Sequence, residues 1–562
     1  MKNTIKSLIL NALLTLFPLT ASAAHYDVLI RGGTVYDGSG EPGVRGDVAI
    51  VGDRIAAIGD LGGDTAERVV DASGQAVSPG FINMLSWAVT SLQKDGRGLS
   101  DIKQGVTLEV FGEGWSMGPL PKGEQGRAML RDVLGEDPGK VEWTTLGEYL
   151  DYMADRGVSP NIASFVGATT LRIHEIGFEN RPPTAEEMQN MKALVRQAME
   201  EGAMGLGSSL IYPPAFFAST EELVELAKVV GEYGGMYISH MRSEGNRIED
   251  SLHELIRIAR EGGVGAEVYH LKLAGRQNWD KLPAVIDIIE KARAEGLRIT
   301  ADMYTYIAGG TGLAASFPPW ASDGGTQALL ERLRDPETRE RIVAEMRKDA
   351  DDWENLYYGA GPDGVMIMGV EKDELKSWSG RTVADIARER GTDPEETVVD
   401  MVLESDGAVS AMYFLMNEEN VRKEIALPWV SFGSDAEAIA PEGEVLEQAT
   451  HPRAYGNFAR LLGHYVREEK LISLQEAVRR LSALPAENLK LGDRGRLLPG
   501  YYADVVVFDP NTIADRATFE NPHQLAVGVN DVFVNGVQVL DDGGHTGATP
   551  GRVVRGPGYK GD

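Results

Sequence analysis

Residues 235–275, GMYISHMRSEGNRIEDSLHELIRIAREGGVGAEVYHLKLAG, constrain the fold of this chain more than any other segment. Two short apolar runs end in histidines, His240 and His270, and the apolar residues between them recur at helical spacing until Gly262-Gly263. A strand–helix–strand unit of this length makes its strands parallel and brings their carboxyl ends together. We therefore expect both imidazoles to point into one mouth, as a divalent metal site requires. For a single histidine after a buried strand, a packed core position would be the commoner outcome.

Residues 79–486 repeat this pattern of strand followed by helix. About eight such units in about four hundred residues is the number expected of a (β/α)8 TIM barrel with insertions, and a doubly wound open sheet is the alternative. The candidate strands include SAMYFLM and WVSFGSDA. Residues 318–368 interrupt the pattern with the charged sequence LLERLRDPETRERIVAEMRKD. We expect a helical insertion there, near the barrel mouth, that acts as a lid.

Both ends of the chain alternate apolar and polar residues between glycine and aspartate turns, as in YDVLIRGGTVYDGSG and RGRLLPGYYADVVVFDP. We expect residues 24–78 and 487–562 to build one small β domain together. A chain of 562 residues is long enough for a large domain with a smaller companion. The expected fold class is therefore α/β, a TIM barrel with a small β-sandwich domain formed from both chain ends.

The first 23 residues predict a secretory signal peptide. Lys2 and Lys6 give a positive start, residues 8–19 are apolar, and Ala21-Ser22-Ala23 suits a cleavage site. The apolar run is short for a membrane span. We expect a periplasmic or secreted protein that is free of the membrane after cleavage, with an uncleaved anchor as the alternative. The chain has no cysteine, which excludes disulfides and thiolate ligands.

The chain carries 85 acidic and 55 basic side chains, a formal net charge of -30. Nucleic acids and anionic membranes would be repelled, so neither is expected as a partner. No Walker loop, dinucleotide-binding glycine motif or nucleophile elbow occurs in a suitable context. We expect a small-molecule substrate with a carboxylate, and the sequence leaves a homo-oligomer open.

Two carboxylates follow other candidate strands. Asp435 ends WVSFGSD, where it could act as a general base on a metal-activated water or instead cap the following helix. Glu113 lies between glycines in VFGEGWSMGP, where it could complete a metal site or remain an exposed turn residue.

Tyrosines and cations near strand ends are candidates for substrate contacts. Tyr304 and Tyr306 alternate on one face of RITADMYTY, where a hydroxyl could stabilise an oxyanion unless both rings only pack. Lys272 and Arg242 each follow a histidine by two residues, and Arg453 lies near another strand end. Each of these cations could bind a substrate carboxylate, although a structural salt bridge is the usual role of any one of them. Arg172 also lies near a candidate strand end, so it too could bind a substrate carboxylate or form a structural salt bridge.

Together these stretches resemble the D-aminoacylase (N-acyl-D-amino-acid deacylase) branch of the amidohydrolase superfamily. The resemblance runs over nearly the whole chain after residue 23 and includes DVLIRGGTVYDGSG, SPGFIN, QGVTLEVFGEG, GAMGLGSSLIYPP, ISHMRSEG, HLKLAG, ADMYTY, SFGSDA, HPRAYGNFARLLG and RGRLLPGYYADVVVFDP. It implies a metal-dependent barrel with a small β domain made from both ends. It also implies hydrolysis of the amide bond of N-acyl-D-amino acids or related D-configured compounds.

The resemblance assigns roles to particular residues. His240 and His270 fall on the family's two zinc-binding histidines, and Asp435 falls on its catalytic aspartate. Lys272 and one of Tyr304 or Tyr306 fall near positions that hold substrate.

The chain departs from this family after its first expected barrel strand. Relatives carry a His-x-His there, in a phrase like P-G-F-I-D-x-H-x-H, where this chain has Leu85 and Trp87. The family's bridging cysteine is also missing, with Glu113 in or beside its place. The glycine-flanked histidine after the third strand is altered to Gly167-Ala168-Thr169-Thr170. A two-metal site of the usual kind is therefore not expected, because the apolar Leu85 and Trp87 would fill the space of a second ion.

What remains suits one zinc ion, held by His240, His270 and Glu113, with Asp435 beside it. In the expected reaction Asp435 deprotonates the attacking water and then protonates the leaving nitrogen. A tyrosine hydroxyl holds the oxyanion, and Lys272, Arg242 or Arg453 binds the substrate carboxylate.

Two other functions stay open. The same fold could act on a cyclic amide, a lactone or another ester, with Leu85 and Trp87 shaping the substrate pocket. Alternatively, the chain could be a binding homologue that lost catalysis together with the His-x-His.

Overall fold

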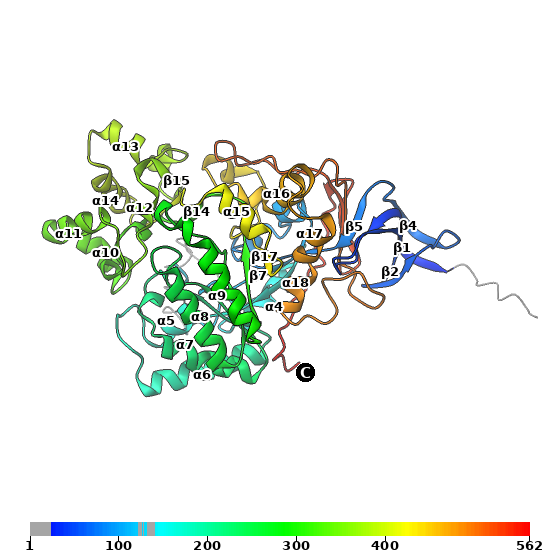
Figure 1. The fold of residues 1–562 in the computed structure, drawn as a ribbon, viewed down its shortest axis with the longest axis horizontal. Coiled ribbons are helices and arrows are strands. Elements are labelled where there is room, and N and C mark those ends of the chain that lie inside the picture. The colour runs from blue at the N-terminus through cyan, green and yellow to red at the C-terminus, as the bar shows by residue number, and fades with distance from the viewer. Residues whose placement is uncertain (1–23, 122–125, 127–128, 132–140, 562) are drawn as a thin grey trace, which may run out of the picture.

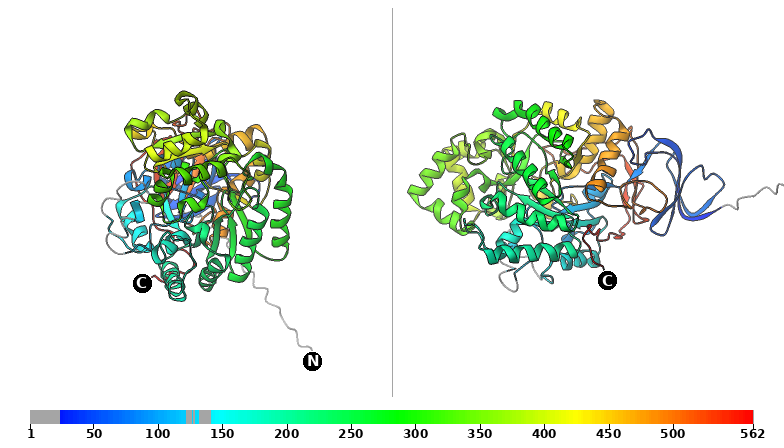
Figure 2. Two further views of the ribbon diagram at one scale, coloured as in Figure 1. Left: turned by 90° about the vertical axis from the view of Figure 1, so that its left-hand side faces the viewer. Right: turned by 60° about the horizontal axis from the view of Figure 1, so that its bottom comes forward.

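The computed structural model describes residues 24–121, 126, 129–131 and 141–561. The expected signal peptide therefore lies outside the described residues. Two views agree on an elongated arrangement (Figure 1, Figure 2), with the first strands of the chain at one end and the helices around residues 330–400 at the other. Among the described residues, no helix is long and apolar enough to cross a membrane.

Two parallel sheets form the middle of the molecule. In spatial order, the larger sheet contains β17 (Val430–Phe432), β13 (Ile299–Met303), β12 (Gly265–Val268), β11 (Met236–His240), β10 (Gly205–Ser209) and β9 (Val166–Gly167). The smaller sheet contains β6 (Phe81–Asn83), β7 (Val106–Phe111) and β8 (Asn161–Ser164). These strands are buried almost throughout, as parallel strands covered on both faces must be.

The two parallel sheets meet at both edges. On one side β8 leads directly into β9. On the other, the backbone N–H of Met84 donates to the carbonyl of Phe432 at 3.3 Å, and Ser86 forms a parallel bridge with Ala436. The chain segments that follow β6 and β17 therefore run side by side.

Helices follow the parallel strands, as the alternation in the sequence predicted. Those between β6 and β17 that cover these sheets are α1 (Ser91–Lys94), α2 (Leu99–Ile102), α4 (Leu146–Arg156), α5 (Ala168–Glu175), α6 (Ala185–Glu200), α7 (Thr220–Glu232), α8 (Ile248–Gly262) and α9 (Leu282–Ala294). In α8, the residues Leu252, Leu255 and Ile256 are buried on one face. Gly263 ends that helix in a left-handed conformation at φ 68°, which costs glycine little.

The strand–helix alternation is interrupted between β13 and β17. This interruption, the inserted region, is longer than residues 318–368, where the sequence predicted an insertion. An antiparallel sheet contains β14 (Gly309–Gly312), β16 (Val409–Tyr413) and β15 (Val365–Val370) in that order. It is joined to α10 (Thr326–Arg334), α11 (Pro336–Met346), α12 (Leu356–Ala360), α13 (Val383–Arg390) and α14 (Pro394–Glu404), which share a hydrophobic core with it. The candidate strand SAMYFLM is β16, so it belongs to this inserted sheet; its apolar run reads like a barrel strand because it is buried.

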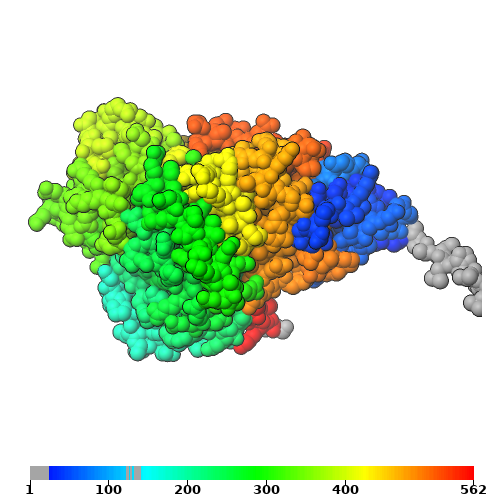
Figure 3. Space-filling view, in the orientation of Figure 1, coloured from blue at the N-terminus to red at the C-terminus, as the bar shows by residue number. Residues whose placement is uncertain are grey.

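Strands from both chain ends form one nine-stranded sheet. It contains β1 (His25–Val35), β2 (Val44–Val51), β3 (Arg54–Gly59), β4 (Thr65–Asp71), β5 (Ala76–Pro79), β18 (Val505–Phe508), β19 (Val529–Val534), β20 (Val537–Asp541) and β21 (Gly544–His545). The ends join where β5 pairs antiparallel with β18. The space-filling view shows the N-terminal strands against the late, orange part of the chain (Figure 3).

Four α-helices follow β16: the first lies between β16 and β17, and the other three lie between β17 and β18 of the nine-stranded sheet. They are α15 (Glu418–Ile425), α16 (Arg453–Arg460), α17 (Leu474–Leu481) and α18 (Ala483–Asn488).

Candidate metal and active site

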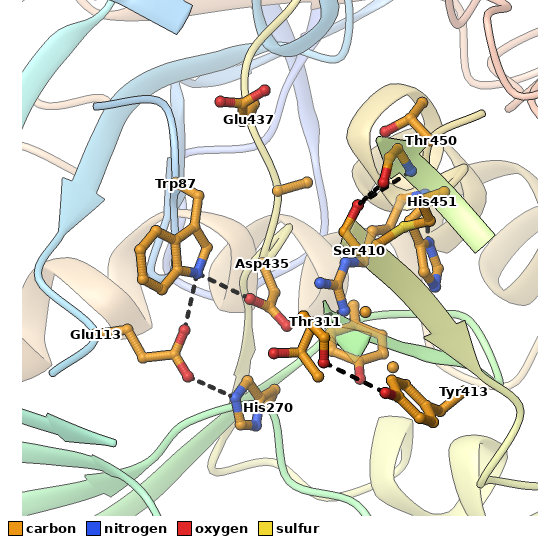
Figure 4. Close-up of a pocket in the computed structure, with 18 of the residues that line it drawn as sticks. Trp87, Glu113, His270, Thr311, Ser410, Tyr413, Asp435, Glu437, Thr450 and His451 are labelled. Atoms are coloured by element: carbon orange, nitrogen blue, oxygen red, sulfur yellow. Dashed lines mark hydrogen bonds and ion pairs between the residues drawn. The ribbon is translucent and has the colours of Figure 1, made fainter. Parts of the chain in front are cut away.

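A cavity of about 660 Å³ lies at the carboxyl ends of the parallel strands, with the inserted region on its other side (Figure 4). Parallel α/β folds place their sites at this edge because the turns after the strands converge there. The lining includes the polar or ionisable side chains of Glu113, His240, Glu244, His270, Lys272, Tyr304, Asp435 and Arg453, and the aromatic or aliphatic ones of Trp87, Trp115, Ile211, Leu356 and Met368.

Three buried side chains converge in this cavity. Glu113 follows β7, His240 ends β11 and His270 follows β12. Oε1 of Glu113 lies 3.0 Å from Nδ1 of His240 and 2.9 Å from Nε2 of His270. All three offer ligand atoms within 4.8 Å of one another, and none is more than 5% exposed. One carboxylate oxygen and two imidazole nitrogens form a donor set that zinc prefers, with a position left open for water or substrate.

Two of the residues at the strand ends have strained backbones. His270 has φ 37° and Asp435 has φ 49°, in the left-handed region that side-chain-bearing residues rarely adopt. Each turn is held by a backbone donor: the N–H of His270 donates to Oδ1 of Asp302, and the N–H of Asp435 donates to the carbonyl of Leu85, both at 2.8 Å. The surrounding structure thus fixes both side chains toward the cavity.

The charges of this cluster fit a divalent cation. Burial raises the pKa of Glu113, but His270 and His240 outweigh it and hold that pKa well below its usual range. Burial and Lys272 oppose protonation of His270, yet Glu244 and Glu113 raise the pKa of His270 to about 10. A divalent ion would replace the imidazolium proton as the balance for these carboxylates, because imidazole binds metals in its neutral form. Nε2 of His240 is also buried without a hydrogen-bond partner among the described residues.

Glu244 is a site residue that the sequence analysis missed. Its Oε1 lies 3.0 Å from Nδ1 of His270 and accepts a hydrogen bond from Nζ of Lys272 at 2.6 Å. A carboxylate on the outer nitrogen of a metal-binding imidazole orients the ring and raises its basicity. The signal was present in ISHMRSEG, where Glu244 follows His240 by four residues. Glu354 of the inserted region accepts the backbone N–H of Glu244 at 2.5 Å.

Asp435 lines the same cavity as Glu113, His240 and His270, and its carboxylate contacts Trp87 and Arg453. Nε1 of Trp87 donates to Oδ1 of Asp435 at 3.1 Å, and Nη1 of Arg453 lies 2.8 Å from its Oδ2. Burial, reinforced by Glu113 and opposed by Arg453, raises the pKa of Asp435. No helix begins at Asp435, because the next helical turn is Gly443–Glu447. The helix-capping alternative is therefore not what the structure shows.

The two candidate tyrosines lie in different surroundings. Tyr304 lines the cavity, and its buried hydroxyl has no hydrogen-bond partner among the described residues. Burial raises the pKa of Tyr304 to about 12, so the hydroxyl keeps its proton and can donate it in a hydrogen bond. Tyr306 is not part of the cavity lining; its hydroxyl donates to Oδ2 of Asp515 at 3.3 Å.

The structure brings Lys272 and Arg453 to the cavity but not Arg242. The guanidinium of Arg242 points away, where it donates to both carboxylate oxygens of Glu254 at 2.9 Å and to two backbone carbonyls. Its position two residues after His240 does not place it in the mouth, because α8 supplies a carboxylate on the outer side. Arg172 is likewise structural, since it forms a buried ion pair with Glu222 at 2.7 Å.

Residues 68–540 match the model of the amidohydrolase family. Over 530 residues the chain is 35% identical to a D-aminoacylase from Alcaligenes xylosoxydans xylosoxydans. The aligned region covers 94% of this chain and 97% of that protein.

Solved structures agree with the sequence comparison. One solved structure is a D-aminoacylase described as having a binuclear metal centre with one-metal activation and second-metal attenuation. It matches with a TM-score of 0.78 at 35% identity, and the match covers 94% of this chain and 100% of the D-aminoacylase chain. An N-acyl-D-glutamate deacylase from Bordetella bronchiseptica, complexed with zinc and a phosphonate inhibitor, has a TM-score of 0.78 at 31% identity, with coverage of 94% and 100%. The mixed α/β fold and the resemblance seen in the sequence are both confirmed.

Proposed function

This chain belongs to the amidohydrolase family, and from that premise we propose that it hydrolyses the amide bond of N-acyl-D-amino acids or related D-configured compounds with the help of one zinc ion. The observation that carries this proposal is the convergence of Glu113, His240 and His270 in one cavity, with Asp435 beside them. D-Aminoacylase and N-acyl-D-glutamate deacylase, which cover 94% of the chain at 35% and 32% identity, support the substrate class.

Glu113, His240 and His270 would hold the zinc ion. When bound, such an ion supplies Lewis-acid chemistry, because it polarises a carbonyl oxygen and acidifies water. Among the described residues of this cavity, the donor set offers ligands for a single ion of this kind. Leu85, which is 1% exposed, and Trp87 have no lone pair with which to ligate a second.

Asp435 is the proposed general base and acid. Its carboxylate takes the proton from the attacking water and returns it to the leaving nitrogen, so one group serves both proton transfers. Its raised pKa brings the carboxyl closer to the pH at which both transfers are efficient. The Tyr304 hydroxyl, which has a proton and no other acceptor among the described residues, donates to the developing oxyanion.

Arg453 and Lys272 are the proposed partners of the substrate carboxylate. Both line the cavity and both lie near the Tyr304 ring, at 4.5 Å from its centroid for Arg453 Cζ and 5.6 Å for Lys272 Nζ. They flank the position where an α-carboxylate would sit while its amide meets the metal ligands. The aromatic and aliphatic lining around Trp115, Ile211 and Met368 suits an apolar acyl group or side chain.

The proposal extends to the whole chain. We take the two parallel sheets as the wall of one (β/α)8 barrel, supported by the Met84–Phe432 and Ser86–Ala436 backbone contacts. We take residues 24–78 and 487–562 as a small β domain, supported by the pairing of β5 with β18. Residues 1–23 would direct export to the periplasm or beyond, supported by their charged, apolar and small-residue segments.

A hydrolysis panel tests the function. Zinc-loaded enzyme is incubated with matched N-acyl-D- and N-acyl-L-amino acids, D-dipeptides, a cyclic amide and lactones, and the released amine or acid is measured before and after chelation. Faster release from N-acyl-D-amino acids than from their L enantiomers, lost on chelation and restored by zinc, is expected. Hydrolysis confined to the cyclic amide or lactones, or none with any substrate, would contradict the proposal.

A further inference from the structure

The Trp87 side chain joins two carboxylates of the site. Its indole Nε1–H donates to Oε2 of Glu113 at 2.8 Å and to Oδ1 of Asp435 at 3.1 Å (Figure 4). An indole nitrogen carries one hydrogen and accepts no hydrogen bond. This single donor is therefore shared between two acceptors. A neutral group that cannot ligate a metal thus lies between a metal-ligand carboxylate and the proposed general base.

The remaining oxygens of the two carboxylates face other partners. Oε1 of Glu113 faces His240 and His270, and Oδ2 of Asp435 faces Arg453. Each carboxylate therefore presents one oxygen to Trp87 and the other to the reactive part of the cavity. Rotation of either carboxylate would break its contact with the indole.

The position of Trp87 is fixed by the backbone as well. The backbone N–H of Trp87 donates to the carbonyl of Ala436 at 3.0 Å, and the backbone N–H of Asp435 donates to the carbonyl of Leu85 at 2.8 Å. Ser86 and Ala436 form a parallel bridge between these two bonds. The strand extensions that carry Trp87 and Asp435 are thus held in register, and a site on rigid elements keeps its geometry better than one on loops.

We propose that Trp87 is a positioning residue whose indole N–H holds the Glu113 and Asp435 carboxylates side by side at the proposed metal site. The inference rests on the proposed function and goes beyond it. Two buried carboxylates that face each other repel, and a donor between them offsets that repulsion. Trp87 also lines the cavity, so its expected part in shaping the substrate pocket stays a prediction beside this role.

The test removes the indole N–H in two variants, of which one also loses the two-ring shape and the other keeps it. Trp87 is replaced by phenylalanine (Trp87→Phe) and, by genetic-code expansion, by benzothienylalanine, in which sulfur takes the place of the N–H in a ring of nearly the same shape. Trp115→Phe is the matched control, because Trp115 lines the same cavity without a hydrogen bond from its indole to any described residue. Zinc affinity is measured by competition with a chromophoric chelator, the ligand field by the visible spectrum of the cobalt-loaded proteins, and kcat and KM on an N-acyl-D-amino acid.

Both Trp87 variants should bind zinc about 10-fold or more weakly, the loss typical when a group that supports a metal ligand is removed. Their cobalt spectra should change, and kcat should fall while KM stays within about 3-fold, because the carboxylates and not the substrate lose their support. Trp115→Phe should keep the zinc affinity and the cobalt spectrum of the wild type.

Two results would overturn this inference alone. One is wild-type zinc affinity and an unchanged cobalt spectrum in both Trp87 variants. The other is a defect in Trp87→Phe that the benzothienyl variant lacks, which would assign the effect to ring shape. A wild-type protein that binds no zinc would overturn the proposed function itself, and this inference with it.

Discussion

Nη1 of Arg453 lies 2.8 Å from Oδ2 of Asp435, and their side chains are only 5% and 11% exposed. The same guanidinium lies over the Tyr304 ring, and its Nε is buried without a hydrogen-bond partner among the described residues. The cation that is best placed for a substrate carboxylate therefore also contacts the proposed general base. Substrate binding and proton transfer should consequently be coupled through Arg453.

Asp435→Asn should lower kcat strongly but leave the zinc content unchanged. The amide keeps the shape of the carboxyl and can still accept from Trp87, but it cannot take up a proton. A positioned general base or acid typically contributes about 100- to 10,000-fold, so kcat should fall by that order. Elemental analysis of the same preparation checks the metal. Wild-type kcat in a zinc-loaded Asp435→Asn protein would remove Asp435 from the mechanism.

Tyr304→Phe should lower kcat by about 100-fold or more, the effect of losing one oxyanion donor, with little change in KM. Tyr306→Phe is the matched control: Tyr306 lies on the same strand extension, but its hydroxyl donates to Asp515 outside the cavity. Steady-state kinetics on one N-acyl-D-amino acid compare the two variants. Equal effects of the two substitutions would mean that Tyr304 only packs.

Glu354 should make the protein less stable as the pH rises. Burial, and next the charge of Glu244, raise the pKa of Glu354 from 4.5 to about 8. Between these values the folded chain keeps a proton that the unfolded chain has lost, so stability is full below about pH 4.5 and falls as the pH rises through about 8.

Glu354→Gln should flatten this pH dependence, because the amide does not ionise. Urea unfolding at several pH values between 5 and 9, at constant zinc, gives the slope. Glu340→Gln, at an exposed position of α11, should retain the wild-type slope. Identical slopes in the wild type and in Glu354→Gln would contradict the assignment.

The buried ion pair of Arg172 and Glu222 should matter for stability. The side chains are 1% and 3% exposed, so Arg172→Met leaves an uncompensated buried carboxylate, which typically costs about 3–5 kcal/mol. Arg257 and Glu221 form a comparable pair on the surface, with side chains 43% and 69% exposed. Arg257→Met should cost no more than about 1 kcal/mol. Denaturant unfolding compares them, and equal losses would show that burial does not set the cost.

The strand-based part of the site was predictable from the sequence. His240, His270, Glu113 and Asp435 each sit at or just past the end of an apolar run, and parallel strands bring such ends to one edge. The pattern alone left Glu113 open as an exposed turn residue and Asp435 open as a helix cap; the burial of Glu113 and the absence of a helix start at Asp435 decide between these alternatives.

The side chains of the following loops were not predictable in the same way. Lys272 follows its histidine by two residues and turns inward to Glu244, whereas Arg242 has the same spacing and turns outward to Glu254. The direction depends on which carboxylate a neighbouring element supplies, and a single strand–loop sequence does not contain that information. The hydrogen bond from the Trp87 indole to Asp435 was not predictable either, because it joins residues that are 348 positions apart in the sequence.

The central claim is that Glu113, His240 and His270 hold a single divalent metal ion. Anomalous diffraction from a zinc-loaded crystal, measured on both sides of the zinc absorption edge, tests it most directly. The account predicts one edge-dependent peak at about 2.0–2.2 Å from a Glu113 oxygen and from one nitrogen of each histidine, with the Trp87 indole still between the two carboxylates. No peak among these three residues, or a second zinc beside Trp87, would contradict it.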